Sequence, residues 1–358
     1  MATRTLLRPT GVVDSPFGHD GKVARLAGGL NWFAAVELLT VEGQRRVASE
    51  LIAVAEVESR LDDQLAPQWQ ALTAARPPLQ LGERTVRLDQ PQVMGILNVT
   101  PDSFSDGGRF SGSHDAAIAG ADMTAAGAAI IDVGGESTRP GSSPVWEGDE
   151  IDRVVPVIRQ IAGGGAAISI DTRKGEVARV AVGAGARLVN DVSALTYDPR
   201  LADVTAAAGV PIVLMHHQGD PQTMQDNPRY GDVLVEVYLW LEERIAAAEA
   251  AGIPRERILV DPGFGFGKSV AHNLELMNGL AIFHSLGCPL VLGASRKRTI
   301  GALSNEAPAD QRLGGSIALA LKAVEQGAHI VRVHDVPETV QALRVWRGLR
   351  DQALTPRT

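Results

Sequence analysis

The sequence predicts an α/β fold, a (β/α)8 or TIM barrel, with a small N-terminal helical extension. One observation is a unit that recurs eight times, in which a short apolar run follows an Ala-rich segment ending in Gly and leads into polar residues. The other is that the apolar runs do not alternate with polar residues, which is typical of parallel strands covered on both faces. Alternating strands and helices indicate a parallel sheet, and eight units fit a closed barrel. An open doubly wound sheet is the alternative, because a sequence does not prove closure.

Each unit has the same physical basis. Alanine favours helix, and Gly127, Gly185, Gly209, Gly252 and Gly327 could each end a helix in the left-handed C-cap conformation. The eight apolar runs are expected within residues 91–102, 125–138, 163–174, 182–193, 206–219, 251–268, 286–298 and 325–335.

Residues 1–78 do not follow the repeat and form the first of two expected domains. Residues 31–75 carry apolar side chains at mixed three- and four-residue spacing among many charges, so we expect a helical extension. The stretch "ARPPLQLG" at residues 75–82 has the Pro pair of a linker. A packing or dimer-contact role is favoured over a second activity, and the barrel is expected over residues 79–358.

Composition narrows the class of protein. The net charge of −8 gives no basic footprint for nucleic acid or for an anionic membrane. A single cysteine, Cys288, excludes an internal disulfide and a multi-cysteine metal site. The N-terminus lacks the apolar core of a signal peptide, and no long uncharged apolar run suggests a membrane span. We therefore expect a cytoplasmic protein that acts on small molecules.

Polar residues follow every predicted strand, and the carboxyl ends of parallel strands form the active-site end of such folds. These residues are Asn98, Asp132, Glu136, Asp171, Asn190, Asp191, His216, His217, Asp261, Ser295, Arg296, Lys297, Arg332 and His334. Asp171, Asn190 and Asp261 could together offer two carboxylates and an amide to a ring that bears amino and N–H donors. The alternative is that the two carboxylates cap helices or pair with Arg173 and Lys297.

The glycine-rich stretch "DPGFGFGKS" at residues 261–269 is not a phosphate-binding P-loop, because Pro262 stands where that motif needs Gly. Its glycines would instead let a planar ligand approach the backbone, with Phe264 and Phe266 as apolar walls. A plain glycine-rich turn is the alternative.

A diphosphate site is predicted from the last strand. Arg332 and His334 lie two residues apart, so their side chains point to one face, and a guanidinium binds phosphate oxygens bidentately. Asn98 could add an oxygen ligand for Mg²⁺, which bridges phosphates and keeps several waters. An ordinary salt bridge of Arg332 across the barrel end is the alternative.

Taken together, these motifs resemble the dihydropteroate synthase family of folate biosynthesis. "MGILNVTPDSFSDGG" and "DVGGESTRPG" are similar to the two signature segments of that family. "SIDT", "NDVS", "DPGFGFGK", "SRK" and "RVHD" follow in the family's order, and the likeness covers about residues 80–345. One departure is His217, where the family commonly has an apolar residue.

The resemblance implies a homodimeric, Mg²⁺-assisted enzyme that joins 4-aminobenzoate to 7,8-dihydropterin-6-ylmethyl diphosphate. It implies a pterin pocket of Asp171, Asn190, Asp261 and Lys297, lined by Met215 and Phe266. It assigns diphosphate and Mg²⁺ to Asn98, Arg332 and His334, assisted by Thr138 and Arg139. It places Ser295, Phe104, Pro140 and Phe264 around 4-aminobenzoate, with Asp106 completing the site. The implied catalytic residues are Asn98, Asp106, Lys297, Arg332 and His334.

Two other functions are compatible with parts of this pattern. A pterin-dependent methyltransferase acting on a corrinoid would share the carboxylate and amide pocket, but it would not need "SRK", "RVHD" or the polar segment after Asn98. A non-catalytic relative that only binds pterin would not need the complete set of polar strand ends.

Overall fold

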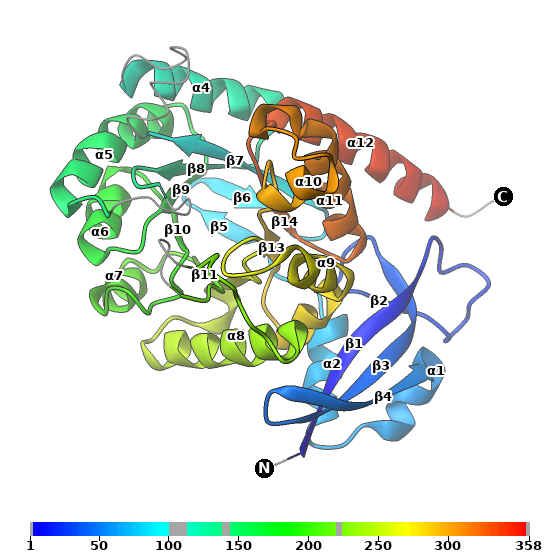
Figure 1. Ribbon diagram of the computed structural model, residues 1–358. Helices are drawn as coiled ribbons and strands as arrows, with labels where there is room; N and C mark the ends of the chain where they lie inside the picture. The colour runs from blue at the N-terminus through cyan, green and yellow to red at the C-terminus, as the bar shows by residue number, and fades with distance from the viewer. Residues whose placement is uncertain (1–2, 100–112, 138–143, 220–223, 356–358) are drawn as a thin grey trace.

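The computed structural model describes residues 3–99, 113–137, 144–219 and 224–355. Its centre is a parallel sheet of eight strands surrounded by helices, as Figure 1 shows. The strands are β7 (Gln92–Asn98), β8 (Ile130–Gly134), β9 (Ile168–Asp171), β10 (Leu188–Asp191), β11 (Ile212–Met215), β12 (Ile258–Asp261), β13 (Val291–Leu292) and β14 (Ile330–Val333).

The sheet closes on itself. Neighbouring strands run in the order β12-β11-β10-β9-β8-β7-β14-β13, so β14, the last strand of the barrel, pairs with β7, the first. A parallel bridge between Val260 and Leu290 joins β12 to the segment that leads into β13. The predicted barrel is therefore confirmed, and an open sheet is excluded.

Helices follow the strands around the barrel. They are α4 (Ser113–Ala126), α5 (Glu147–Gly163), α6 (Gly175–Ala184), α7 (Arg200–Ala208), α8 (Val233–Ala250), α9 (Val270–Asn278), α10 (Arg298–Leu303), α11 (Leu313–Glu325) and α12 (Val336–Ala353). Short 3-10 helices η2 (Arg255–Arg257), η3 (Leu280–Leu286) and η4 (Ala309–Gln311) lie between them. Gly209 ends α7 in the left-handed conformation at φ 62°, as the repeat predicted. No helix among the described residues is long and apolar enough to cross a membrane.

An apolar layer seals the amino-terminal end of the barrel. The hairpin of β5 (Leu79–Leu81) and β6 (Arg84–Val86) supplies its leucine and valine side chains to this layer. Each barrel strand, or the residue just before it, contributes one side chain: Met94, Ile130, Ala167, Leu188, Val213, Leu259, Val291 and Ile330. The hairpin therefore acts as the floor of the barrel.

The polar residues lie one step above this floor. Successive side chains of a strand point to opposite faces, so a residue two positions further on lies on the same face. In β8 this step leads from Ile130 to Asp132, and in β12 it leads from Leu259 to Asp261. The same step leads from Leu188 to Asn190, from Val213 to Met215 and from Ile330 to Arg332. Along β8, β10, β12 and β14 the barrel interior thus changes from apolar to polar within about 7 Å.

The prediction of a helical N-terminal extension is wrong. The segment forms an antiparallel sheet of β1 (Thr3–Val13), β2 (Ala24–Arg25), β3 (Trp32–Glu42) and β4 (Arg45–Ala53). It is followed by α1 (Val54–Val57), η1 (Glu58–Arg60) and α2 (Leu65–Thr73). The division of the chain at residue 78 stays a prediction.

The physical reason is that this sheet is buried on both faces over part of its length. Leu6 and Leu39 join the core shared with the barrel, whereas Leu7 and Val36 join a separate core beneath α2. Two buried faces remove the polar–apolar alternation by which strands are recognised. The overlooked signal was Gly43, which has φ 61° in the two-residue connection between β3 and β4.

Buried polar contacts join this sheet to the barrel. Asn31 donates from Nδ2 to the carbonyl oxygen of Val324 at 2.6 Å. Arg76 donates from Nη2 to the carbonyl oxygen of His284 at 2.9 Å. Because these donors satisfy main-chain groups of the barrel, the sheet packs as a fixed part of the molecule.

The outer edge of β1 is protected by α2, which gives a testable prediction. Gln68 accepts from the N–H of Leu7 at 3.0 Å and donates to the carbonyl oxygen of Thr5 at 2.9 Å. Gln68→Ala leaves both groups unsatisfied, so we expect the free energy of unfolding in urea to fall by about 2 kcal/mol. Gln70→Ala, at an exposed position of the same helix, should change it by less than about 0.5 kcal/mol. Equal losses in the two variants would contradict this role of Gln68.

Candidate active site

A buried ion cluster lies at the centre of the barrel. Arg332 on β14 donates from Nε to Asp132 Oδ2 at 2.6 Å and from Nη2 to Asp171 Oδ2 at 2.6 Å. Asn190 donates from Nδ2 to the same Asp132 oxygen at 2.9 Å. Asp132 is fully buried and Asp171 is 6% exposed. The guanidinium is therefore shared between two carboxylates that have almost no contact with solvent.

Burial and neighbouring charges set the protonation of this cluster. Burial raises the pKa of Asp171, and Arg332 opposes that rise. Burial lowers the pKa of Arg332, but Asp132 and Asp171 more than offset this and raise it overall. Arg332 is thus a permanent cation.

Lys297 and the glycine-rich loop form a second part of the site. Asp261, at the end of β12, accepts from the N–H of Gly263 at 2.7 Å. Lys297 donates to the carbonyl oxygen of Phe264, and its Nζ lies 4.3 Å from the ring centre of Phe266. Burial lowers the pKa of Lys297 to about 7, although Asp261 raises it. The Lys297 amine therefore exchanges its proton near neutral pH.

Ser295 and His334 form a third part. The N–H of His334 donates to Ser295 Oγ at 3.2 Å, and His334 Nδ1 lies 3.0 Å from the same oxygen. A hydroxyl that accepts from the backbone can donate its own proton to Nδ1, and the Nε2 nitrogen would then carry the ring proton.

Asn98 and Met215 are the remaining predicted site residues that the structure describes. A Cβ on Gly134 would lie 3.7 Å from both Asn98 Oδ1 and Asp171 Oδ2, so Gly134 is the narrow spacer between them. Met215 pairs with Asp261 in the register of β11 and β12 and is buried. The structure thus brings together, on neighbouring strands or through direct contacts, the residues Asn98, Asp171, Asn190, Met215, Asp261, Phe264, Phe266, Ser295, Lys297, Arg332 and His334. The other predicted site residues, Phe104, Asp106, Thr138, Arg139 and Pro140, lie outside the described residues.

Sequence reasoning did not include Asp132 among the site residues. It was noted only as a polar residue near the end of a strand, yet it holds both Arg332 and Asn190. The available signal was its spacing of two from Ile130, which places a carboxylate inside the barrel instead of on a loop.

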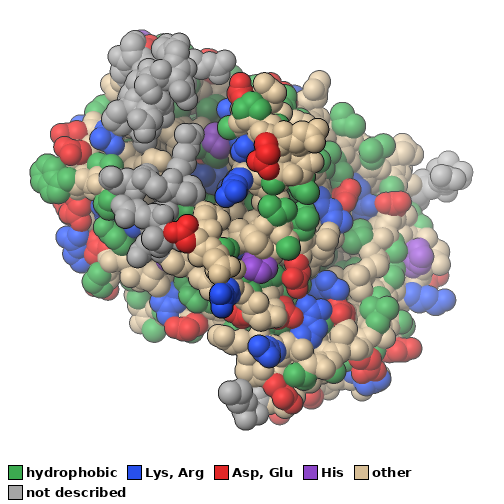
Figure 2. Space-filling model, viewed as in Figure 1, with side chains coloured by type: hydrophobic (Ala, Val, Ile, Leu, Met, Phe, Trp, Pro, Cys, Tyr) green, Lys and Arg blue, Asp and Glu red, His purple; other side chains and the backbone are tan. Residues whose placement is uncertain are grey.

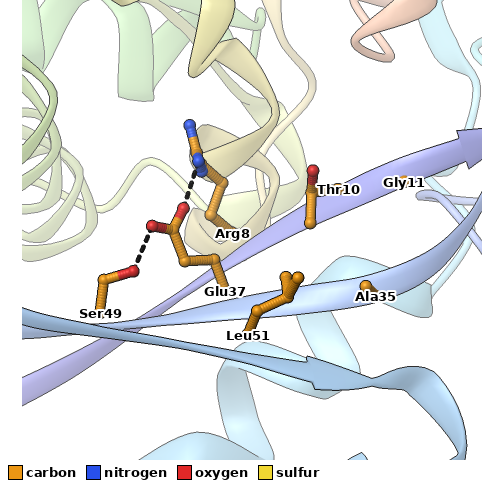
Figure 3. A pocket seen from close by; sticks show the side chains of 7 residues that line it. All are labelled: Arg8, Thr10, Gly11, Ala35, Glu37, Ser49 and Leu51. Carbon is orange, nitrogen blue, oxygen red and sulfur yellow. Dashed lines mark hydrogen bonds and ion pairs between the residues drawn. The ribbon is translucent and has the colours of Figure 1, made fainter.

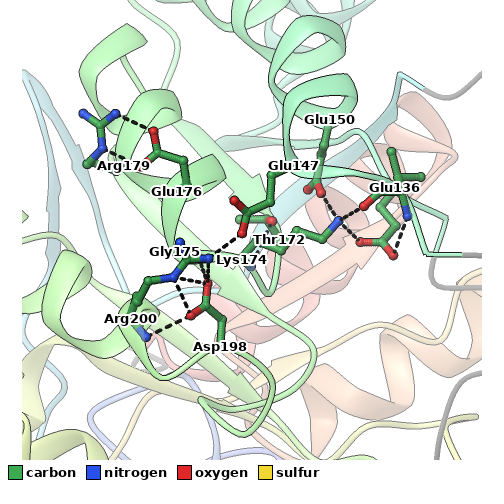
Figure 4. A network of polar contacts seen from close by, with 11 residues as sticks. Glu136, Glu147, Glu150, Thr172, Lys174, Gly175, Glu176, Arg179, Asp198 and Arg200 are labelled. Atoms are coloured by element: carbon green, nitrogen blue, oxygen red, sulfur yellow. Dashed lines mark hydrogen bonds and ion pairs between the residues drawn. The ribbon is translucent and has the colours of Figure 1, made fainter.

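A second polar network lies beside the cluster (Figure 4). Lys174, just before α6, donates to Glu136 Oε2 at 2.7 Å and to Glu150 Oε2 at 2.6 Å. It also donates to the carbonyl oxygen of Val145 at 2.7 Å. Arg173 donates to Glu136 Oε1 at 2.9 Å, so it does not pair with Asp171, as one alternative expected. The network ties α5 and α6 to the segment after β8.

A pocket of about 390 Å³ lies on the N-terminal sheet, away from the barrel cluster (Figure 3). Its lining includes Arg8, Glu37 and Ser49. Glu37 is paired with Arg8 and accepts from Ser49 at 2.5 Å, so its charge is already neutralised. This arrangement offers no group for catalysis comparable to the barrel cluster.

The residues that the structure describes contain no group of three or more His, Cys, Asp or Glu side chains that could hold a metal ion. Acidic and basic side chains are interspersed over the coloured part of the face drawn in Figure 2. Buried ion pairs join Arg332 to Asp132 and Asp171 inside the barrel, and Lys174 to Glu136 and Glu150 beside it.

Comparisons with known proteins agree with this geometry. The family model described as "Pterin binding enzyme" matches residues 94–334. The dihydropteroate synthase of Escherichia coli (strain K12) is 52% identical over 259 residues, which are 72% of this chain and 91% of that protein. The chain belongs to the dihydropteroate synthase family. The family match spans β7 to β14 and leaves the N-terminal sheet outside it.

Solved structures of the family have the same fold. The Xanthomonas albilineans dihydropteroate synthase with 4-aminobenzoic acid has a TM-score of 0.73 and 47% identity, over 78% of this chain and 100% of that chain. The complex of the X. albilineans family member with 7,8-dihydropteroate has a TM-score of 0.70 and 44% identity, over the same shares. The eight-stranded barrel described above is thus the family's fold.

The low pKa of Lys297 gives a prediction for the site. Below about pH 7 its amine is an ammonium, and above that pH it is neutral. A ligand acceptor that favours the ammonium raises its pKa on binding, so affinity should fall as pH rises through 7, by three- to tenfold per unit. Calorimetry with a pterin that lacks the diphosphate measures this. A titration of the ligand itself would appear in Lys297→Gln as well. An equal pH dependence in the two proteins would contradict the assignment.

Proposed function

We propose that this chain joins 4-aminobenzoate to 7,8-dihydropterin-6-ylmethyl diphosphate, forming 7,8-dihydropteroate and releasing diphosphate. The observation that carries this proposal is Asp132 Oδ1, which is buried and makes no hydrogen bond with the described residues. A buried carboxylate oxygen is costly without a donor, and the amino and N–H groups of a pterin ring are donors. The X. albilineans complexes with 4-aminobenzoic acid and 7,8-dihydropteroate support the same chemistry.

The pterin is held by acceptors on one side and by a cation on the other. The acceptors are oxygens of Asp132, Asp171, Asn190 and Asp261, and Met215 and Phe266 cover the faces of the ring. Lys297 donates to a ring acceptor, since an ammonium only donates. The pair of Phe264 and Lys297 thus links the ring pocket to the glycine-rich loop.

The departing diphosphate is stabilised from the other side of the pocket. Arg332 uses Nε and Nη2 for the two carboxylates, which leaves Nη1 for phosphate oxygens. His334 donates from Nε2 when Nδ1 accepts from Ser295. As negative charge develops on the leaving group, these preorganised donors lower the energy of the transition state.

Magnesium is proposed as the cofactor. Asn98 offers a neutral oxygen, Oδ1, and lies across Gly134 from Asp171 in the strand register. This sparse donor set fits Mg²⁺, which is usually held by few protein ligands together with substrate phosphates and water. Bound Mg²⁺ would neutralise charge on the diphosphate, with Asn98 as its protein ligand.

Bond formation needs little proton transfer from the protein. As the C–O bond to the diphosphate breaks, the electron-rich pterin shares the positive charge that develops on its exocyclic methylene. The aromatic amine of 4-aminobenzoate attacks that carbon to form the C–N bond and then loses one proton to solvent. Ser295 and Phe264 border the position of the aminobenzoate. Phe104, Pro140 and Asp106, which the family resemblance assigns to the same region, are proposed to complete it.

A homodimer and a cytoplasmic location are further parts of the proposal. The homodimer is supported by Val345 and Leu349, two exposed apolar side chains one helical turn apart on α12. The cytoplasmic location is supported by Cys288, the single cysteine, which is buried and free.

An omission assay tests the proposed reaction. Purified protein with pterin diphosphate, 4-aminobenzoate and Mg²⁺ should form dihydropteroate, and chelation of Mg²⁺ or omission of either substrate should abolish the product. Diphosphate release measured in parallel should match dihydropteroate one to one. Pterin binding without product would indicate a non-catalytic relative. Methyl transfer from a methylated pterin to a corrinoid would indicate the methyltransferase instead.

Arg332→Lys tests the role of the guanidinium. Lysine keeps one positive charge between the carboxylates but loses the fork of donors, so we expect kcat/KM for pterin diphosphate to fall at least about 100-fold in a folded protein. Arg332→Met should in addition destabilise the fold by about 3–5 kcal/mol, because two buried carboxylates lose their partner. Arg347→Lys, on the exposed face of α12, is the matched control. Near wild-type turnover of Arg332→Lys would refute the assignment.

A further inference from the structure

The glycine-rich loop after β12 is built into a very narrow space. Gly263, Gly265 and Gly267 have φ angles of 68°, 83° and 61°. A Cβ on Gly263 would lie 1.7 Å from the carbonyl oxygen of His216, and one on Gly267 would lie 2.4 Å from that of Gln218. The loop thus packs directly on the main chain that follows β11, and its shape depends on groups that hold it there.

Side chains from the surrounding segments satisfy every carbonyl oxygen of this loop from Gly263 to Gly267. The donors are Lys268 Nζ to Gly263 at 2.9 Å, Lys297 Nζ to Phe264, Gln225 Nε2 to Gly265 at 2.6 Å, Lys268 Nζ to Phe266 at 3.1 Å and Tyr230 Oη to Gly267 at 2.9 Å. One amine, that of Lys268, makes two of these five contacts.

Lys268 is a buried lysine and not a surface one. It is 3% exposed, and its Nζ also lies 2.9 Å from His216 Nδ1. Burial lowers its pKa well below the ordinary value, and Lys297 lowers it further. An ammonium would donate to all three acceptors. A neutral amine would donate to the two carbonyls and accept from His216 Nδ1, so all three contacts survive in either state.

We propose that Lys268 is a positioning residue that acts through Lys297. Its amine fixes the carbonyl oxygens of Gly263 and Phe266, which flank and support the carbonyl of Phe264 that holds the Lys297 amine. The ring of Phe266 lies beneath the Lys297 amine, and the hydrogen bond from Lys268 to the carbonyl oxygen of Phe266 holds this residue in place. Without the Lys268 amine, the loop loses two internal ties, and Lys297 loses its defined place beside the pterin pocket. The inference rests on the proposed function only for the kinetic readout.

The test is a double-mutant cycle between the two lysines. Lys268→Met removes the donors, and we expect kcat/KM for pterin diphosphate to fall about 100-fold while KM for 4-aminobenzoate changes less than threefold. Introduced into Lys297→Gln, the same substitution should cost less than about threefold, because the group it positions is already absent. Independent, multiplied losses would overturn the proposal. Lys268→Gln, which keeps an N–H donor, should recover part of the loss.

A matched control separates positioning from general destabilisation. Arg76 is also a buried cation that donates to three carbonyl oxygens, those of Ala71, Ala74 and His284, but it lies outside the glycine-rich loop. Arg76→Met should lower stability while leaving kcat/KM of the folded enzyme within threefold and its effect independent of Lys297→Gln. Coupling of Arg76 to Lys297 as strong as that of Lys268 would also overturn the proposal.

Two further measurements keep the inference testable by itself. Calorimetric affinity for a pterin without diphosphate can be measured in the same cycle, so the coupling is read even if the wild-type protein makes no dihydropteroate. If the Lys268 variants do not fold, His216→Leu removes the third partner of the amine, so the amine is held less firmly against its two carbonyl acceptors. That variant should weaken pterin binding only while Lys297 is present. An equal weakening in the Lys297→Gln background would contradict the proposal.

Discussion

The ionic contact between Arg332 and two carboxylates is the constraint on which the barrel interior depends. Asp132 and Asp171 lie where solvent is almost absent, and burial of unpaired charges there would cost several kcal/mol each. The guanidinium reaches both because its strand, β14, pairs with β7 and so lies close to β8 and β9. The curvature of the sheet, which brings β14 within reach of β8 and β9, therefore also lets the interior charges pair.

The barrel was predictable because its repeat can be recognised from local sequence features. These are apolar runs that are buried on both faces and that follow a glycine at the end of a helix. The N-terminal sheet was not, although its residues are equally apolar. Leu6 and Leu7 are neighbours that are both fully buried, against different cores. Such a pair removes the period of two, and the remaining spacing resembles that of a helix. The single local signal, Gly43 between two strands, was too short to outweigh it.

The site was predictable wherever function and strand position coincide. Asp171, Asn190, Asp261 and Arg332 stand at or near the ends of strands, and the structure places them around one another. Asp132 was noted as a polar residue near a strand end but given no role, and its carboxylate lies two residues before the end of β8, inside the barrel. The hydrogen bonds from the Lys268 amine to the loop carbonyls were also beyond prediction, since the orientation of those carbonyls depends on positive φ angles in the loop.

The hairpin that floors the barrel has a consequence for traffic of reactants. In the part of the chain that the structure describes, leucine and valine side chains of the hairpin close the amino-terminal end of the barrel. Ligands therefore enter and leave by the carboxyl-terminal end. The ligand that binds deepest in the barrel therefore has to bind first, because a ligand bound above it blocks the open end. Sequential loading would then follow from geometry, with no need for communication between separate sites.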